Sequence, residues 1–108
     1  MKNKFGETVK PQYEVYIYGW SQWCSIEAAI ANHDIEVFSY ICADSYREAA
    51  KAAKSMSLKK GQVYKGEYGK REIVDVSIVC YFSDDTSDYN PAWEEFYENG
   101  KKLKRCDF

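Results

Sequence analysis

A thiol and an imidazole stand near one another in the sequence, which suggests nucleophilic chemistry. Cys24 precedes His33, the single histidine of the chain, and Asp34 and Asp44 follow it. A cysteine nucleophile needs a base within hydrogen-bond reach and a third group that orients the base. Asn32-His33-Asp34 is equally an ordinary turn, however, and a lone cysteine commonly packs as a small apolar side chain. We therefore expect no enzyme, and the pair of Cys24 and His33 remains the weaker, thiol-based alternative.

Candidate ligands for a zinc ion or a phosphate do not complete a known pattern. Zinc sites draw their cysteines as closely spaced pairs, whereas the four cysteines here are far apart. They are Cys24, Cys42, Cys80 and Cys106. Gly61, Gly66 and Gly69 do not form a phosphate-binding loop and are more typical of turns. We expect neither a metal nor a cofactor at these positions.

One acidic stretch comes closer to a calcium site. Its oxygen-bearing residues alternate, and a carboxylate follows them. They are Asp84, Thr86, Asp88, Asn90 and Glu95. Calcium loops of the EF-hand type require a glycine where this stretch has Tyr89, and Pro91 stiffens the chain. An acidic turn that caps a following helix is the simpler interpretation, and metal binding by residues 84–90 stays open.

Basic residues and tyrosines are interleaved in another stretch. They are Lys59, Lys60, Tyr64, Lys65, Tyr68, Lys70 and Arg71, and residues 101–105 form a second basic patch. Such interleaving can hold single-stranded nucleic acid through backbone charge and base stacking. The net charge is only −2, from 15 basic and 17 acidic residues, which argues against a dedicated polyanion binder. Nucleic-acid binding is therefore the alternative function.

Aromatic residues are more numerous than a small core needs, with ten Tyr, five Phe and three Trp among 108 residues. The aromatic residues are expected to gather in two separate groups. The first shares one face of a strand, and the second shares one face of a helix. They are Tyr16, Tyr18 and Trp20, and Trp93, Phe96 and Tyr97. Tyr and Trp are enriched at binding hot spots. We therefore expect a non-catalytic protein-protein interaction module, whose partner is another protein or a second copy in a homodimer.

Further expectations concern source and location. The composition, rich in Lys, Tyr and Ile, suggests a bacterial or phage protein. An inhibitor, an immunity or counter-defence protein, or an assembly subunit would fit. Residues 1–12 are polar and rich in Lys, unlike a secretory signal. Apolar runs are far shorter than the ~20 residues that span a bilayer. We therefore expect a cytoplasmic protein with reduced thiols and no membrane association.

Hydrophobic periodicity predicts the strands that position these residues. Alternation of apolar and polar residues predicts strands over 13–20, 35–42 and 73–82. The second strand is expected to be central because both of its faces are apolar, with Val37 and Ile41 on the same face.

Helix and turn signals fill the remaining segments. Residues 23–33 fit a strand or a short helix, and Ser25 as N-cap slightly favours the helix. A capping box of serine and glutamate predicts a helix over 45–58. Residues 62–70 suggest a turn or short hairpin. Asn90-Pro91 favours a final short helix over the rival interpretation, a tight hairpin turn at Asn99-Gly100.

Together these elements predict an α+β domain. It has a small, mostly antiparallel sheet of three to four strands, one long helix packed on a face and a short C-terminal helix. The stretch from Ile41 to Ala50 resembles a strand-to-helix corner of many small ferredoxin-like domains, which implies that layering and no activity. We expect a flexible N-terminal arm at 1–12, a single domain at 13–100 and a basic C-terminal tail at 101–108.

Overall fold

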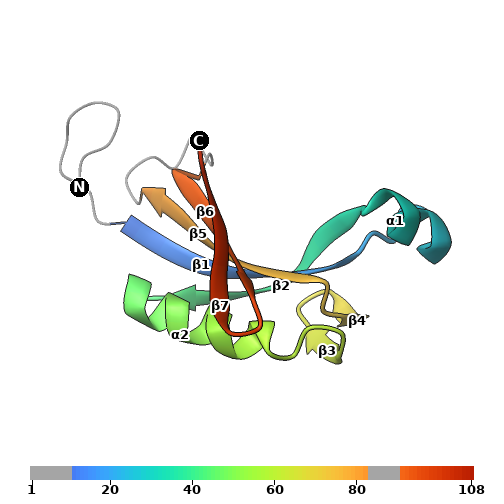
Figure 1. Ribbon diagram of the computed structural model, residues 1–108, viewed down its shortest axis with the longest axis horizontal. Helices are drawn as coiled ribbons and strands as arrows, with labels where there is room; N and C mark the ends of the chain where they lie inside the picture. Colours follow the sequence, from blue (N-terminus) through green and yellow to red (C-terminus); the bar gives the residue numbers. More distant parts are fainter. Residues whose placement is uncertain (1–10, 83–90) are drawn as a thin grey trace.

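The computed structural model describes residues 11–82 and 91–108, and a five-stranded antiparallel sheet forms its centre (Figure 1). The strands lie in the order β2-β1-β5-β6-β7 and are β1 (Pro11–Trp20), β2 (Ile35–Ala43), β5 (Asp75–Phe82), β6 (Trp93–Glu98) and β7 (Lys101–Asp107). Two helices and a second, two-stranded sheet accompany it: α1 (Ile26–Asn32), α2 (Tyr46–Ser57), β3 (Val63–Gly66) and β4 (Gly69–Glu72). The predicted α+β class is confirmed, and the main sheet is larger than the three to four strands predicted.

Two predicted segments fall partly or wholly outside the described residues. The arm predicted at 1–12 is described only at Pro11 and Gln12, which begin β1. The acidic residues 84–90 are outside the described ranges, so metal binding there stays a prediction.

The core lies between α2 and one face of the main sheet (Figure 1). Alternate residues of β1 and β5 face the helix, since Val15 pairs with Ile78 and Ile17 pairs with Val76. All four side chains are buried, and each contributes about 1.5–3 kcal/mol by leaving water. The helix adds Ala49, Ala53 and Met56. The small alanines let the helix lie close to the β-branched floor of the sheet.

Serine side chains hold both ends of α2. Ser45 Oγ accepts a hydrogen bond from Glu48 N at 3.2 Å, as a capping box requires. The Glu48 carboxylate, however, accepts from Asp44 N at 3.2 Å rather than from Ser45 N. At the other end, Ser57 Oγ accepts from Gly100 N at 2.8 Å and so ties the helix to the turn between β6 and β7.

The C-terminal part is a hairpin, and the prediction of a short helix over 90–99 is wrong. Within 93–98, the odd-numbered residues are buried and the even-numbered ones are half-buried, which is the period of a strand. Asn99 and Gly100 have φ of 52° and 78°, as a type I′ hairpin turn requires. Residues 101–107, predicted as a basic tail, pair with β6 as strand β7. The two-residue alternation therefore outweighs the helix-start signal of Asn90-Pro91.

β2 is an edge strand and not the central strand predicted. A β-bulge at Phe38 interrupts its pairing with β1, so Val37 pairs with Tyr18 while Ile41 pairs with Val15. Val37 and Ile41 therefore lie on opposite faces, and their predicted common face is wrong. Bulges commonly re-aim a side chain, and here the Phe38 ring is fully buried in the core. This inserted residue made both faces of the strand look apolar in the sequence.

The β3–β4 hairpin packs against β2 at a glycine, which confirms the hairpin predicted over 62–70. Tyr68 N donates to Phe38 O at 3.0 Å, and the rings of Phe38 and Tyr64 meet edge-on with centroids 6.3 Å apart. A Cβ on Gly66 would lie 2.5 Å from Ser39 Cβ and 2.7 Å from Phe38 O. Only glycine therefore allows this close approach.

α1 stands at the end of the β1–β2 pair, away from the body of the sheet (Figure 1). Ser25 Oγ accepts from Ala28 N at 3.2 Å, so the helix favoured for this segment is confirmed. It is capped by His33 with a left-handed φ of 50°. Neither helix in the described ranges has the length and apolar character needed to cross a bilayer.

Candidate protein-binding face

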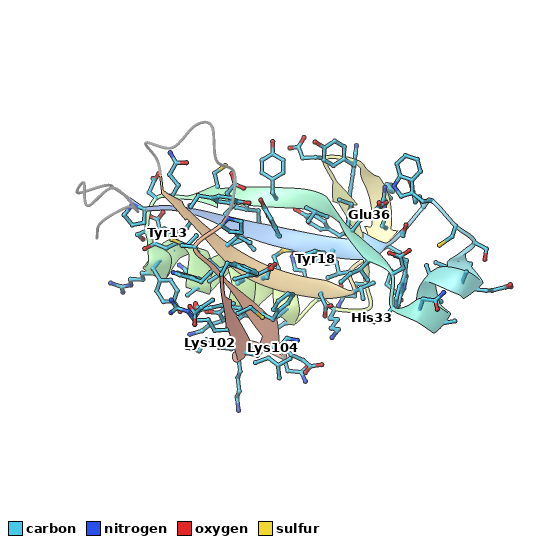
Figure 2. All side chains as sticks on the ribbon, turned by 90° about the horizontal axis from the view of Figure 1, so that it is seen from above. Tyr13, Tyr18, His33, Glu36, Lys102 and Lys104 are labelled. Atoms are coloured by element: carbon cyan, nitrogen blue, oxygen red, sulfur yellow. The ribbon has the colours of Figure 1, made fainter. Side chains whose placement is uncertain are left out.

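The face of the main sheet opposite α2 carries the aromatic residues predicted for β1. Cross-strand pairing places side chains of all five strands on it. They include Glu14, Tyr16, Tyr18 and Trp20 of β1, Val37 and Tyr40 of β2, Ser77, Val79 and Tyr81 of β5, Glu94 and Phe96 of β6, and Lys104 of β7. We call it the open face, because no helix or strand of the described chain lies over it. Figure 2 looks onto this face, with Tyr18 near its middle and His33 at the end that carries α1.

Hydrogen bonds among the side chains hold the centre of the open face. Tyr18 Oη donates to Glu94 Oε2 at 2.5 Å, and Ser77 Oγ donates to the same oxygen at 2.7 Å. The hydroxyls of Tyr16 and Tyr81 bond to each other. Burial first, and then these bonds, raise the pKa of both Tyr16 and Tyr18 above the usual tyrosine value. The phenols therefore stay neutral at physiological pH and present fixed rings.

The predicted aromatic residues of β1 are half-buried. Tyr18 stacks on Phe96 with ring centroids 6.2 Å apart, and its ring also meets that of Tyr16. Trp20 Nε1 donates to Glu72 Oε2 at 2.9 Å, and its ring meets His33 edge-on. The centre of the open face is thus a packed platform in which the hydroxyls of Tyr16, Tyr18 and Ser77 are hydrogen-bonded, and the aromatic rings of β1 stay partly exposed.

The second predicted aromatic group is divided between two sides of the sheet. Trp93 and Tyr97 are 7% and 3% exposed and belong to the core, whereas Phe96 lies on the open face. A strand separates neighbouring side chains in this way, whereas the predicted helix would have gathered the three on one stripe. The three residues therefore do not form a single site.

Glu95, predicted as a possible calcium ligand, lies in the core instead. It is 1% exposed, and its Oε2 lies 3.4 Å from Lys102 Nζ of β7. Trp93 lies on the same side of β6, and its ring and those of Tyr13 and Tyr46 meet pairwise at centroid distances of 5.8–6.1 Å. Glu95 and Lys102 therefore form an ion pair that joins β6 to β7.

Several exposed apolar residues at the α1 end were not singled out from the sequence. Trp23 is 91% exposed, and Ile26 and Ile30 are 55% and 54% exposed. The signal was available, because a seven-residue helix buries one narrow stripe and here buries only Ala29. Next to them Tyr68, at the tip of the β3–β4 hairpin, is 64% exposed. Single exposed apolar side chains are ordinary, but several gathered in one patch mark an interaction surface.

Arg71 joins the chain segments that lie between α1 and the open face through contacts of its side chain. Its Nη1 lies 2.5 Å from Glu36 Oε1, and its Nη2 donates to Gln22 Oε1 at 2.9 Å. The hydrogen bond from Arg71 is the main cause that lowers the pKa of Glu36. Grooves of about 460 and 420 Å³ lie on either side, one lined by Ile26 among others and the other by Trp23.

Some of the residues predicted for nucleic-acid binding are engaged within the chain, and others are exposed. Arg71 is 12% exposed in its pair with Glu36, and Lys60 Nζ lies 3.5 Å from Asp75 and 3.2 Å from Glu98. Tyr64 packs on Phe38. Other members are exposed: Lys59, Lys65, Tyr68 and Lys70. In β7, Lys104 and Arg105 lie over the rings of Phe96 and Trp93.

The predicted thiol pair has separate partners. Cys24 Sγ lies 3.9 Å from Asp34 Oδ2, while His33 Nε2 lies 3.5 Å from Asp75 Oδ2. The structure shows no hydrogen bond between the side chains of Cys24 and His33. Within 11–82 and 91–108, no three or more His, Cys, Asp or Glu side chains are grouped as metal ligands.

Comparison with known proteins gives no match to a family model, to a curated protein or to a solved structure. The function must therefore be argued from the residues of this chain.

Proposed function

We propose that this chain is a non-catalytic module that binds another protein across the open face and the adjoining α1 end. The observation that carries the proposal is the uneven cover of the sheet. α2 buries one face, while the other face holds a packed layer of aromatic rings under no described helix or strand. A sheet that needed only a solvent face would carry charged and small polar residues there.

The exposed residues beside the open face support a protein partner. Trp23, Ile26 and Tyr68 flank the grooves around Arg71, and Trp, Tyr and Arg are the residue types most enriched in binding hot spots. The rings on the platform are fixed by hydrogen bonds, so little side-chain freedom would be lost on binding. A small inhibitor or an assembly subunit is the kind of protein this proposal covers.

The free thiols support an intracellular setting for this proposal. All four cysteines are unpaired, and Cys24 and Cys42 are exposed. Exposed free thiols persist where the surroundings are reducing, as in the cytoplasm.

Capture of the partner with surface variants tests the proposal. The tagged full chain is incubated with an extract of its source cells, alongside Trp23→Ser and the control Leu103→Ser. Leu103 is 60% exposed on β7, the edge strand farthest from β2 in the sheet, so both substitutions remove an exposed apolar side chain, and only Trp23 lies at the α1 end. We expect a stoichiometric partner with the wild-type chain and the control, and a loss of about 30-fold in affinity for Trp23→Ser.

Two outcomes would overturn the proposal. One is the absence of any stoichiometric partner, including a second copy of the chain detected by sedimentation. The other is equal recovery of the same partner by both variants and by a further variant of the open face, Tyr40→Ser, which would place binding elsewhere.

A further inference from the structure

One pocket on the open face combines a carboxylate with three phenol rings. It has a volume of about 350 Å³ and is lined by Glu14, Tyr16, Val37, Tyr40 and Tyr68. Glu14 and Tyr16 come from β1, Val37 and Tyr40 from β2, and Tyr68 from the tip of the β3–β4 hairpin. The hydrogen bond between Tyr68 N and Phe38 O fixes this tip beside β2.

The charge of the pocket is one-sided. Among the residues that the structure describes, Glu14 is the only carboxylate that lines it, and no basic side chain does. Arg71 lines the neighbouring groove, and its guanidinium is already paired with Glu36. No ion pair joins Glu14 to another residue in the described ranges, and its side chain is partly exposed. The described walls of the pocket therefore offer a negative charge without a matching cation.

The rings have the position and the charge state to assist a cation. Tyr16 is fixed through its hydroxyl to Tyr81, and its raised pKa keeps the ring neutral. Tyr40 and Tyr68 are 42% and 64% exposed, so their surfaces are accessible to a ligand. Neutral phenol rings attract a cation placed over their faces, and arginine is the side chain most often found there.

We infer that this pocket receives an arginine side chain of the protein partner. The guanidinium is planar, so it can stack on a tyrosine ring while it donates to the two oxygens of Glu14. A lysine would supply the charge without the planar fit. This inference rests on the proposed function, and it states which chemistry the partner must present to the open face.

Titration with a small probe tests the pocket by itself. The full chain is titrated with N-acetyl-arginine amide and, as the matched neutral control, N-acetyl-citrulline amide, and the tyrosine resonances are followed by NMR. A cation–π contact and a partly exposed ion pair are individually weak, so we expect the arginine probe to bind in the millimolar range. The resonances of Tyr16, Tyr40 and Tyr68 should shift with arginine and not with citrulline.

Two variants sharpen the titration. Glu14→Gln keeps the shape of the side chain and removes its charge, so we expect the dissociation constant of the arginine probe to rise about fivefold or more. Glu27→Gln removes an exposed carboxylate on α1, outside the pocket, and should leave it unchanged. Equal shifts with both probes, or equal affinity in both variants, would overturn the inference.

The same variants separate this inference from the proposed function. If Trp23→Ser reduces partner capture while Glu14→Gln does not, the protein-binding function holds and the arginine pocket fails. If the arginine probe binds but no partner is recovered, the pocket accepts a guanidinium group, but the proposed function fails and the assignment to a partner's arginine fails with it. The chain's own Lys2, Lys4 and Lys10 are a competing source of cations. A variant with these three changed to Gln should bind the probe with unchanged affinity, and tighter binding would assign the pocket to them.

Discussion

Arg71 Nη1 lies 2.5 Å from Glu36 Oε1, and this pair joins β4 to β2 beside the candidate binding face. The side chains are 12% and 27% exposed, so neither is fully solvated. Nη2 of the same guanidinium reaches Gln22, so three segments of the chain meet at one side chain.

Replacement of Arg71 should loosen this junction. Arg71→Met keeps most of the side-chain length but leaves Glu36 without its partner, so we expect a loss of about 1–3 kcal/mol in the free energy of unfolding. Urea denaturation measures it. Arg47→Met, at an exposed position on α2, is the control and should change stability little. A loss no greater than that of the control would show that the pair contributes nothing to the fold.

The same pair predicts a dependence of stability on acid pH. Folding lowers the pKa of Glu36, chiefly through the hydrogen bond from Arg71. A group with a depressed folded pKa stabilises the fold above its unfolded pKa, near 4.3, and loses that contribution as pH falls through the folded pKa. Unfolding of wild type and Glu36→Gln, measured from pH 7 to pH 2, should therefore differ most at neutral pH and converge in acid. Parallel curves would contradict this origin.

Alkaline pH should act through the tyrosines of the sheet. Burial is the first cause that raises the pKa of Tyr16, Tyr18 and Tyr81, and hydrogen bonding reinforces the shift in the first two. A raised folded pKa means full stability below the unfolded value near 10 and a decline as pH rises above it. Phenolate absorbance should therefore appear in two stages, the second coinciding with loss of tertiary circular dichroism. If all tyrosines of the folded protein ionised in a single stage near pH 10, the raised pKa of Tyr16, Tyr18 and Tyr81 would be contradicted.

Gly66 should tolerate no side chain. Its Cβ would lie 2.5 Å from Ser39 Cβ, so Gly66→Ala must push the hairpin away from β2 or shift β2 itself. Overpacking of this kind costs about 1–3 kcal/mol. Glu67→Ala, an exposed change in the same turn, is the matched control. Thermal unfolding and the exchange rate of the Tyr68 amide measure the effect, and equal stability of the two variants would contradict the close packing.

Nucleic-acid binding, the alternative function, should be absent or weak. Lys60 and Arg71 are held by carboxylates, and Lys104 and Arg105 lie over rings of the same chain. We expect no measurable binding of single-stranded DNA or RNA at low salt by fluorescence anisotropy. Binding that is clear at low salt and falls steeply as salt rises would restore the alternative.

Local signals in the sequence predicted the local structure well. Ser45 caps α2, Ser25 caps α1, and the alternation in β1 places Tyr16, Tyr18 and Trp20 on one face, because each depends on neighbouring residues alone. The same alternation was present in 93–98, but the Asn90-Pro91 pair favoured a helix. The I′ turn at Asn99-Gly100 decided the structure as a hairpin.

Features that depend on distant contacts could not be predicted. The bulge at Phe38 reverses the side-chain order of β2, and the Phe38 ring packs in the core against Tyr64 of the β3–β4 hairpin. Trp93 lies in the core and Phe96 on the open face, and which residue takes which side is set by the pairing of β6 with its partner strand. The arginine-accepting pocket brings β1, β2 and a hairpin tip together, and no local pattern in the sequence marks that meeting.

The sheet order has a consequence for how the chain acquires its shape. β1 and β2 are successive strands, as are β5, β6 and β7, so each group needs only modest loop closure. β1 must then find β5 across everything that lies between them, and folds governed by such distant pairings mature in milliseconds to seconds rather than microseconds. When synthesis has reached only α2, that helix has only β1 and β2 of the main sheet to pack against. Its order during synthesis must therefore wait until β5 has left the ribosome.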